Sequence, residues 1–286
     1  VLIGSVSRLY MSNKCLLIAD HKSVDKQIHI FNKNDFSYLT SIGNFGEGPE
    51  EITVMGCLAI DEAHHQLYVS DHAKQKIFSY DMDSVMVDSL YKPQVKTAMN
   101  ETLFPSEYQY INDTLSIAVL IKPTSTSTFN QFLGRWNMNT GEMIPMKYTH
   151  PDIQKKRITF AASEKAGIYV ECYTRHDLMT ICSLDGELLY NIYGPDWDGG
   201  NGNKLQSFGT VMIGNDKIFV SYCGEDYARD SFPTKILVFD LEGNYLKTLE
   251  TGYKISDCCY DSFNNRIILS LNDVVQFAYL DIDGII

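Results

Sequence analysis

Several loop-type positions in this chain carry histidine next to carboxylates, the residue types that exchange protons in acid–base chemistry. They follow short hydrophobic runs, and basic or aromatic residues accompany them. The same composition is common in solvated loops, so it indicates a polar binding surface more strongly than a catalytic site. The candidate ligand-binding residues of this kind are His72, Arg175, His176, Asp177, Glu225, Asp226, Tyr227 and Arg229.

A second segment places oxygen donors at alternate positions, as a calcium loop does. Calcium needs about six to eight oxygen ligands, and this segment lacks the closing glutamate of an EF-hand loop. A solvated loop of glycine and asparagine is therefore the favoured interpretation, with calcium as the alternative and no other cofactor predicted. The candidate metal ligands are Asp196, Asp198, Asn201 and Asn203.

The elements that carry these residues come from a repeat. Six times, a hydrophobic strand ends at a polar residue and is followed by a second strand, most clearly at 16–20 with 28–32 and at 67–71 with 77–81. A spacing of about 40–50 residues is typical of β-propeller blades. The sequence therefore predicts one all-β domain over residues 1–286, a six-bladed propeller with four-stranded antiparallel blades.

In the second blade we expect strands at Met55–Ile60, Gln66–Asp71, Gln75–Asp81 and Val85–Tyr91, named a to d. Val1–Gly4 resembles the end of a d strand, which predicts that strands from both termini close the ring.

The two faces of such a propeller differ in the length of their loops. Because consecutive strands are antiparallel, a–b and c–d turns share one face, while b–c loops and blade-to-blade connections share the other. The first face has short turns and is predicted to be structural, including His64 and His65. The second face is predicted to bind ligands. Its long segments are 43–52, 92–105, 122–128, 149–156, 194–206 and 223–233.

The segment from Ile42 to Glu51 is rich in glycine, but its spacing differs from GxGxxG and no helix is expected after it. We therefore interpret it as a tight connection between blades, with Pro49 setting the entry to the next strand. Its acids are candidates for the mouth of the central channel: Glu47, Glu50 and Glu51.

With these residues, the chain resembles the six-bladed TolB-like or NHL-like propellers of the Gram-negative envelope, most of which have no assigned function. The similar stretches are Phe31–Asn34 and Ile42–Glu50, and the blade pattern spans nearly the whole chain. Glu50-Glu51 stands where the family often has Gly-Glu. The resemblance implies a periplasmic or outer-membrane-anchored lipoprotein, and it supplies no catalytic residues.

Composition excludes some classes of partner. A net charge of -12 opposes nucleic-acid binding, which depends on clustered Lys and Arg. No apolar run is long enough to span a membrane, and a start at Val1 leaves room for an upstream signal sequence or lipid anchor. The seven cysteines lie mostly in apolar strands without metal-ligand spacing, so buried thiols are expected.

Together these features predict a binding or scaffold propeller of the bacterial envelope rather than an enzyme. Its partner would be a protein, peptide or glycan on the face with the b–c loops and blade connections. The alternative is a hydrolase or lactonase that depends on a divalent metal at the mouth of the central channel.

Overall fold

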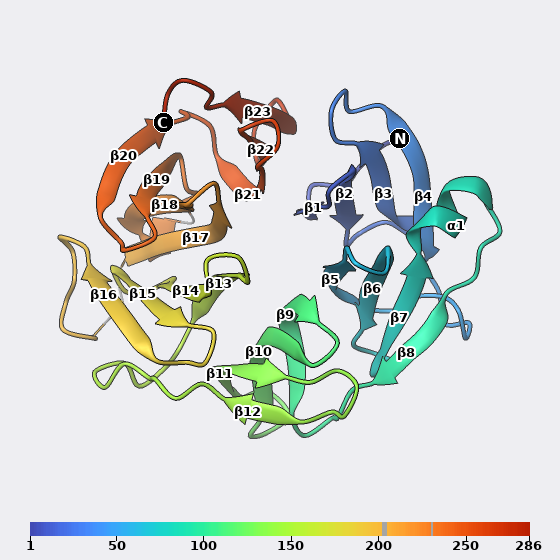
Figure 1. Cartoon of the computed structure of the whole chain (residues 1–286), viewed down its shortest axis with the longest axis horizontal. Helices are drawn as coiled ribbons and strands as arrows, with labels where there is room; N and C mark the ends of the chain where they lie inside the picture. The colour runs from blue at the N-terminus through green and yellow to red at the C-terminus, as the bar shows by residue number, and fades with distance from the viewer. Residues whose placement is uncertain (202–204, 230) are drawn as a thin grey trace. The chain divides into compact units, whose positions relative to one another are not determined.

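The computed structural model describes residues 1–201, 205–229 and 231–286. The chain divides into two compact units, Val1–Pro145 and Met146–Ile286, which are described separately below. Each unit contains three antiparallel sheets, and in every sheet the strands follow one another in chain order. Figure 1 shows the strands of each sheet side by side. The six predicted blades are therefore six meanders of local strand pairs.

Three four-stranded sheets make up the first unit. Their strands are β1 (Ser7–Met11), β2 (Cys15–Asp20), β3 (Lys26–Asn32) and β4 (Tyr38–Asn44), then β5 (Met55–Asp61), β6 (Gln66–Asp71), β7 (Lys76–Asp81) and β8 (Gln94–Ala98), then β9 (Phe104–Asn112), β10 (Leu115–Pro123), β11 (Phe129–Trp136) and β12 (Met143–Pro145).

The second unit has two four-stranded sheets and one three-stranded sheet. Their strands are β13 (Ile158–Ser163), β14 (Ile168–Tyr173), β15 (Leu178–Ser183) and β16 (Leu188–Tyr193), then β17 (Leu205–Gly214), β18 (Lys217–Asp226), β19 (Lys235–Asp240) and β20 (Tyr245–Glu250), then β21 (Ile255–Asp261), β22 (Arg266–Leu271) and β23 (Phe277–Asp281).

Each core lies between adjacent sheets. Strand β2 is buried at every position, because neighbouring strands and a second sheet cover it. In the first unit, Leu17 and Ile28 of one sheet pack with Leu67 and Phe78 of the next. Burial of such side chains stabilises the fold by roughly 1.5–3 kcal/mol each. All seven cysteines are buried thiols without disulfides, as expected.

The outer part of the second blade differs from the prediction. Val85–Tyr91 is not a strand. Helix α1 (Met82–Val87) occupies its start, and the fourth strand, β8, comes later in the chain. Asp81 caps the helix by accepting a hydrogen bond from the Ser84 backbone N–H, and Asp83 adds a carboxylate to the first turn. This local cap outweighs the apolar alternation that suggested a strand.

Two other boundaries also differ. Strand β18 continues through Cys223 to Asp226 and pairs there with Leu205 and Gln206, so the predicted loop at 223–233 starts later. Residues 1–4 form no strand, and the sixth sheet has three strands in the part of the chain that is described. Closure of the ring by both termini remains a prediction.

Candidate functional site

A polar pocket of about 670 Å³ opens among the long connections of the second unit. Three segments supply its walls: the connection before β13, the loop between β14 and β15, and the connection after β16. We call it the cationic pocket. Its lining residues are Asp152, Gln154, Lys155, Arg157, Thr174, Arg175, His176, Gly199, Gly200 and Asn201.

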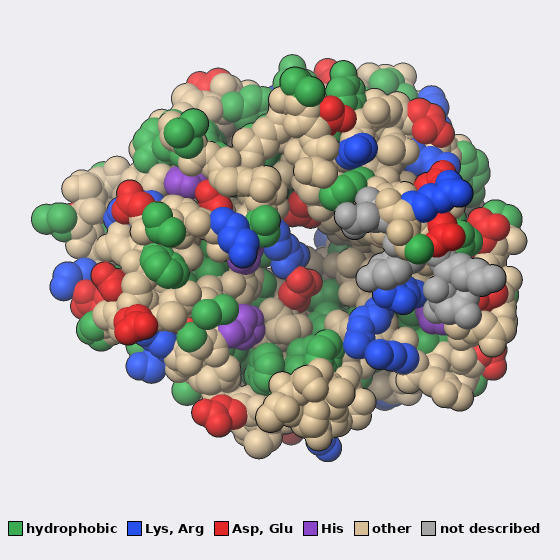
Figure 2. All heavy atoms as spheres, turned by 180° about the vertical axis from the view of Figure 1, so that it is seen from behind, with side chains coloured by type: hydrophobic (Ala, Val, Ile, Leu, Met, Phe, Trp, Pro, Cys, Tyr) green, Lys and Arg blue, Asp and Glu red, His purple; other side chains and the backbone are tan. Residues whose placement is uncertain are grey.

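Among the charged side chains of this lining, positive ones outnumber negative ones. Lys155 is exposed and Arg157 and Arg175 are half-buried, while Asp152 is the one acid among the lining residues. Figure 2 shows groups of Lys and Arg side chains among acidic ones on one face of the molecule. A net charge of -12 therefore coexists with local positive surfaces, and this pocket offers donors for a carboxylate ligand.

An aromatic cluster supports one wall of the cationic pocket. The Trp197 ring lies 5.3 Å from His150, 5.0 Å from Tyr193 and 6.1 Å from His176, measured between ring centroids. Burial lowers the pKa of both histidines below the ordinary value of 6.5, so both are neutral at pH 7. Trp197 is half-buried against these rings, and the positive charge of the pocket comes from lysine and arginine.

Asp177 holds the loops around the pocket in place. It is buried, and its carboxylate accepts hydrogen bonds from the Asp196 N–H at 3.0 Å and from the Tyr222 hydroxyl at 3.3 Å. Its carbonyl oxygen accepts a further bond from the Gly194 N–H at 2.8 Å. Burial raises the pKa of Asp177. The side chain thus joins a b–c loop, a blade connection and β18.

A buried ion pair joins the connection before β13 to β14, the strand that leads into the loop with Arg175. Lys156 pairs with Glu171 of β14, and both side chains are nearly inaccessible to solvent. Burial raises the pKa of Glu171, and the charge of Lys156 opposes that rise. The neighbouring Lys156 is therefore engaged with Glu171, whereas Lys155 faces solvent.

The remaining predicted residues of the second unit lie outside the lining of the cationic pocket. Glu225 and Asp226 end β18, and Tyr227 begins the short helix η1 (Tyr227–Arg229). Arg229 lies 3.9 Å from the Glu225 carboxylate, and Asp226 accepts a bond from the Ala228 N–H at 2.9 Å. Glu225, Asp226 and Arg229 are exposed, and the contacts of these three residues are local to the turn.

In the first unit, the predicted acids belong to the glycine-rich connection. The Glu51 carboxylate accepts a bond from the Gly48 N–H at 2.8 Å, and Glu50 pairs with Lys92 at 2.8 Å. Glu47 is exposed. Gly43, near the end of β4, has a φ of 75° that suits glycine, and the bridge between Phe45 and Ile52 closes the tight connection that follows.

His72 lies in the b–c loop of the second blade. It is half-buried, and its ring lies 5.8 Å from the Phe104 ring. Burial lowers the pKa of His72, which keeps the ring neutral at pH 7. These contacts indicate that His72 packs against the neighbouring blade; its predicted role in binding stays a prediction.

Hydrogen bonds within the predicted calcium segment and to Asp177 hold its backbone in place. Asn201 donates from its amide to the Asp198 carbonyl oxygen at 2.8 Å, and the Asp196 N–H donates to Asp177. Asn203 lies outside the described residues.

Elsewhere, Asp61, His64 and Asp113 bring ligand atoms within 4.8 Å of one another, at turns that were predicted to be structural. Asp61 already accepts bonds from the His64 ring at 2.8 Å and the Tyr68 hydroxyl at 3.0 Å. Burial would raise the pKa of Asp61, but these bonds outweigh it and lower the pKa. The arrangement is a hydrogen-bonded network, and the Asp61 oxygens that would bind a metal already accept hydrogen bonds.

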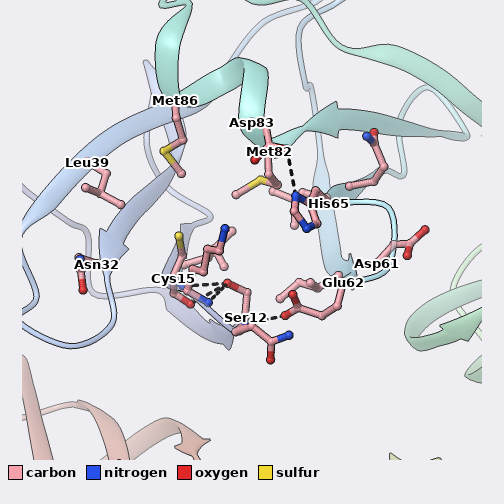
Figure 3. Close-up of a pocket in the computed structure, with 16 residues that line it drawn as sticks. Ser12, Cys15, Asn32, Leu39, Asp61, Glu62, His65, Met82, Asp83 and Met86 are labelled. Carbon is pink, nitrogen blue, oxygen red and sulfur yellow. Dashed lines mark hydrogen bonds and ion pairs between the residues drawn. The ribbon is translucent and has the colours of Figure 1, made fainter. Parts of the chain in front are cut away.

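Sequence reasoning missed a second pocket, of about 500 Å³, at the short turns of the first unit. Figure 3 shows it between the turns that follow β1 and β5, below helix α1. The spacing of Met82 and Met86, four residues apart after the Asp81 cap, was the signal that could have indicated an apolar helix face there.

Comparisons with known proteins agree with this architecture. The profile of the DUF5128 family, described as a 6-bladed beta-propeller, matches residues 1–133. A search of curated proteins finds no match. The helices of the described residues are too short or too polar to cross a membrane.

Three solved structures are similar to the chain. One is a Bacteroides fragilis protein named as exported, with 15% identity, coverage of 95% of this chain and 80% of that one, and a TM-score of 0.60. Another is a member of the DUF4221 family from Bacteroides vulgatus, with 9% identity, coverage of 96% and 92%, and a TM-score of 0.62. The third is the Cps50 (Swd1) beta-propeller domain of Myceliophteria thermophila, with 9% identity, coverage of 98% of both chains, and a TM-score of 0.59.

At these identities the likeness shows the fold alone. The chain is an all-β, six-bladed propeller, as the repeat predicts.

Proposed function

We propose that this protein is a non-enzymatic binding propeller of the bacterial envelope, and that its cationic pocket binds a carboxylate-bearing peptide or glycan. The observation that carries the proposal is the pocket itself: Lys155, Arg157 and Arg175 surround one concave space in a chain whose net charge is strongly negative. The exported protein of Bacteroides fragilis with a similar fold supports the envelope location.

The chemistry of the pocket favours binding over catalysis. His176 is buried and neutral, and Asp177 is engaged by the Asp196 N–H and the Tyr222 hydroxyl. A neutral imidazole keeps a lone pair, but a general base must also reach a substrate proton, and His176 and Asp177 are both buried. Lys155 is exposed and Arg175 is half-buried; both are cations that attract negatively charged groups, and a protonated lysine or arginine does not remove a proton.

Binding can be tested with three defined probes: an oligogalacturonate, an oligoglutamate peptide and a neutral dextran oligosaccharide. We expect saturable binding of an acidic probe that weakens as salt rises, because exposed charge pairs are screened. The double variant Lys155→Gln, Arg175→Gln should lower that affinity at least tenfold. Isothermal titration calorimetry at two salt concentrations measures both effects.

Lys165→Gln is the matched control, since Lys165 is an exposed lysine in the turn between β13 and β14, away from the pocket lining. It should leave the affinity unchanged. Equal binding of dextran and the acidic probes, or equal affinity of the double variant, would contradict the proposal.

A further inference from the structure

The pocket in Figure 3 has the size and lining of a second binding site, in the first unit and unrelated to the cationic pocket. Its volume of about 500 Å³ lies within the range of small-molecule sites. The turn at Ser12–Lys14, the turn at Asp61–His65, helix α1 and strand β4 contribute to its walls. We call it the methionine pocket.

One side of the methionine pocket is apolar and accessible. Met86 is 36% exposed and Leu39 is 43% exposed, and Met82 lies beside them on α1. Figure 3 shows these three side chains on one side of the space. Exposed apolar side chains in a concave site favour an apolar ligand group, and flexible methionines adapt to its shape. The buried Leu17 and Leu67 form the floor.

Carboxylates also line the methionine pocket, from the end of β5, the turn after it and helix α1. Glu62 accepts a hydrogen bond from the Asn13 backbone N–H at 2.6 Å, which fixes its carboxylate at the rim. Asp83 accepts a bond from the His65 ring at 2.9 Å. Together with Asp61, the lining has three carboxylates and a single lysine, Lys14.

We propose that the methionine pocket binds a protonated amine carried on an aliphatic chain. The aliphatic part would lie against Leu39, Met82 and Met86, and the ammonium group would lie at Glu62 and Asp83. A carboxylate of the same length would be repelled by these acids, and a neutral alcohol would lose the ion pair. Either a free alkylamine or a lysine side chain of a partner peptide supplies this chemistry.

The experiment uses the whole chain with carbon-13 labelled methionine methyl groups, because Met82 and Met86 report directly on the pocket. Hexylammonium, hexanol and hexanoate are titrated at pH 7 and followed by NMR. We expect saturable shifts of the Met82 and Met86 signals with hexylammonium, at an affinity at least fivefold above that for hexanol, and weaker binding still for hexanoate. Equal affinities for the three probes, or no saturable shift, would overturn the proposal.

Two variants separate the charge from the shape of the pocket. Glu62→Gln with Asp83→Asn should reduce hexylammonium binding to the level of hexanol while leaving hexanol binding unchanged. His65→Asn should strengthen hexylammonium binding severalfold, since it frees the Asp83 carboxylate, and asparagine tolerates the φ of 52° at this position. If neither variant changes the ratio of the two affinities, the acids do not recognise the ligand and the proposal fails.

A capped peptide with a single central lysine distinguishes the two sources of the amine. Tighter binding of the peptide than of hexylammonium identifies a lysine side chain as the ligand, and the reverse order identifies a free amine; both results support the site only if they depend on Glu62. Thermal unfolding of each variant confirms that the fold is retained.

Discussion

At the scale of single residues, the buried pair Lys156–Glu171 gives the clearest expectation for stability. Lys156→Met should lower the free energy of unfolding by about 3–5 kcal/mol, because it leaves a carboxylate buried without its cation. Adding Glu171→Gln should restore most of that loss. Since burial already raises the pKa of Glu171, the cost should be smaller at pH 5.5 than at pH 7.5.

Urea unfolding at the two pH values measures these differences. Lys147→Met is the matched control, because Lys147 pairs with Glu187 on the surface and that pair should contribute less than about 1 kcal/mol. A loss for Lys156→Met as small as that of the control would show that the buried pair is not needed.

Buried histidines predict a loss of stability in mild acid. Burial lowers the pKa of His21, His29, His72, His150 and His176 in the folded protein. In the unfolded chain these rings titrate near 6.5, so as pH falls below that value the unfolded state takes up protons first and is favoured. The thermal midpoint should therefore fall between pH 7.5 and pH 5.5.

Burial also raises the pKa values of Asp177 and Glu171, and those groups act in the opposite direction. A comparison with His72→Phe isolates the contribution of one histidine: the variant should show a weaker pH dependence than the parent. An identical pH profile for both proteins would mean that His72 does not contribute.

At the scale of elements, one lysine organises the glycine-rich connection between β4 and β5. The Lys74 ammonium group donates to the Glu51 carbonyl oxygen at 2.6 Å, to the Thr53 hydroxyl at 2.9 Å and to the Gly46 carbonyl oxygen at 3.3 Å. It also lies 3.4 Å from the Asp71 carboxylate. These bonds add to the backbone hydrogen bonds of the connection, such as Gly46 N–H to the Ile52 carbonyl oxygen, and tie it to the loop after β6.

Lys74→Met should therefore destabilise the loop by about 2 kcal/mol, in the range of hydrogen bonds that involve a charged group. Hydrogen exchange should quicken at the Gly46 to Thr53 amides while strands β6 and β7 stay protected. Lys22→Met tests the equivalent loop of the first blade, where the lysine is exposed, and should have little effect. Unchanged exchange in Lys74→Met would mean that the backbone alone orders the loop.

At the scale of the whole molecule, the repeat predicts one domain even though two compact units can be described. If residues 1–286 unfold as one domain, scanning calorimetry should give a single transition whose calorimetric and van't Hoff enthalpies agree. Two separate transitions, one for residues 1–145 and one for residues 146–286, would show instead that the chain behaves as two domains.

Calcium provides a second measurement on the whole chain. A ligand at a hundred times its Kd stabilises the native state by about 2.7 kcal/mol, which moves the thermal midpoint visibly. We expect no such shift after EDTA treatment and addition of millimolar calcium, because the side chains of Asp196, Asp198 and Asn201 supply fewer oxygen ligands than the roughly six to eight that calcium needs. A clear rise would favour the metal-dependent alternative and justify lactone assays.

The sequence by itself determined the blades, because a strand pattern that repeats every 40–50 residues and pairs locally needs no distant information. The sequence also placed Arg175 and His176 in a b–c loop, because the order of antiparallel strands along the chain fixes which face each loop lies on. The alternation of apolar and polar residues wrongly predicted a strand at Val85–Tyr91. The Asp81 cap favours helix α1 at the start of that segment.

Only the tertiary structure decided which loop residues meet. Lys155 and Arg157 lie close in sequence to each other but come from a different connection than Arg175, and loop length does not predict that all three line one pocket. The methionine pocket likewise needs the turns of two blades and a helix together. Side-chain convergence depends on packing between distant segments, whereas strand formation depends on neighbours in the chain.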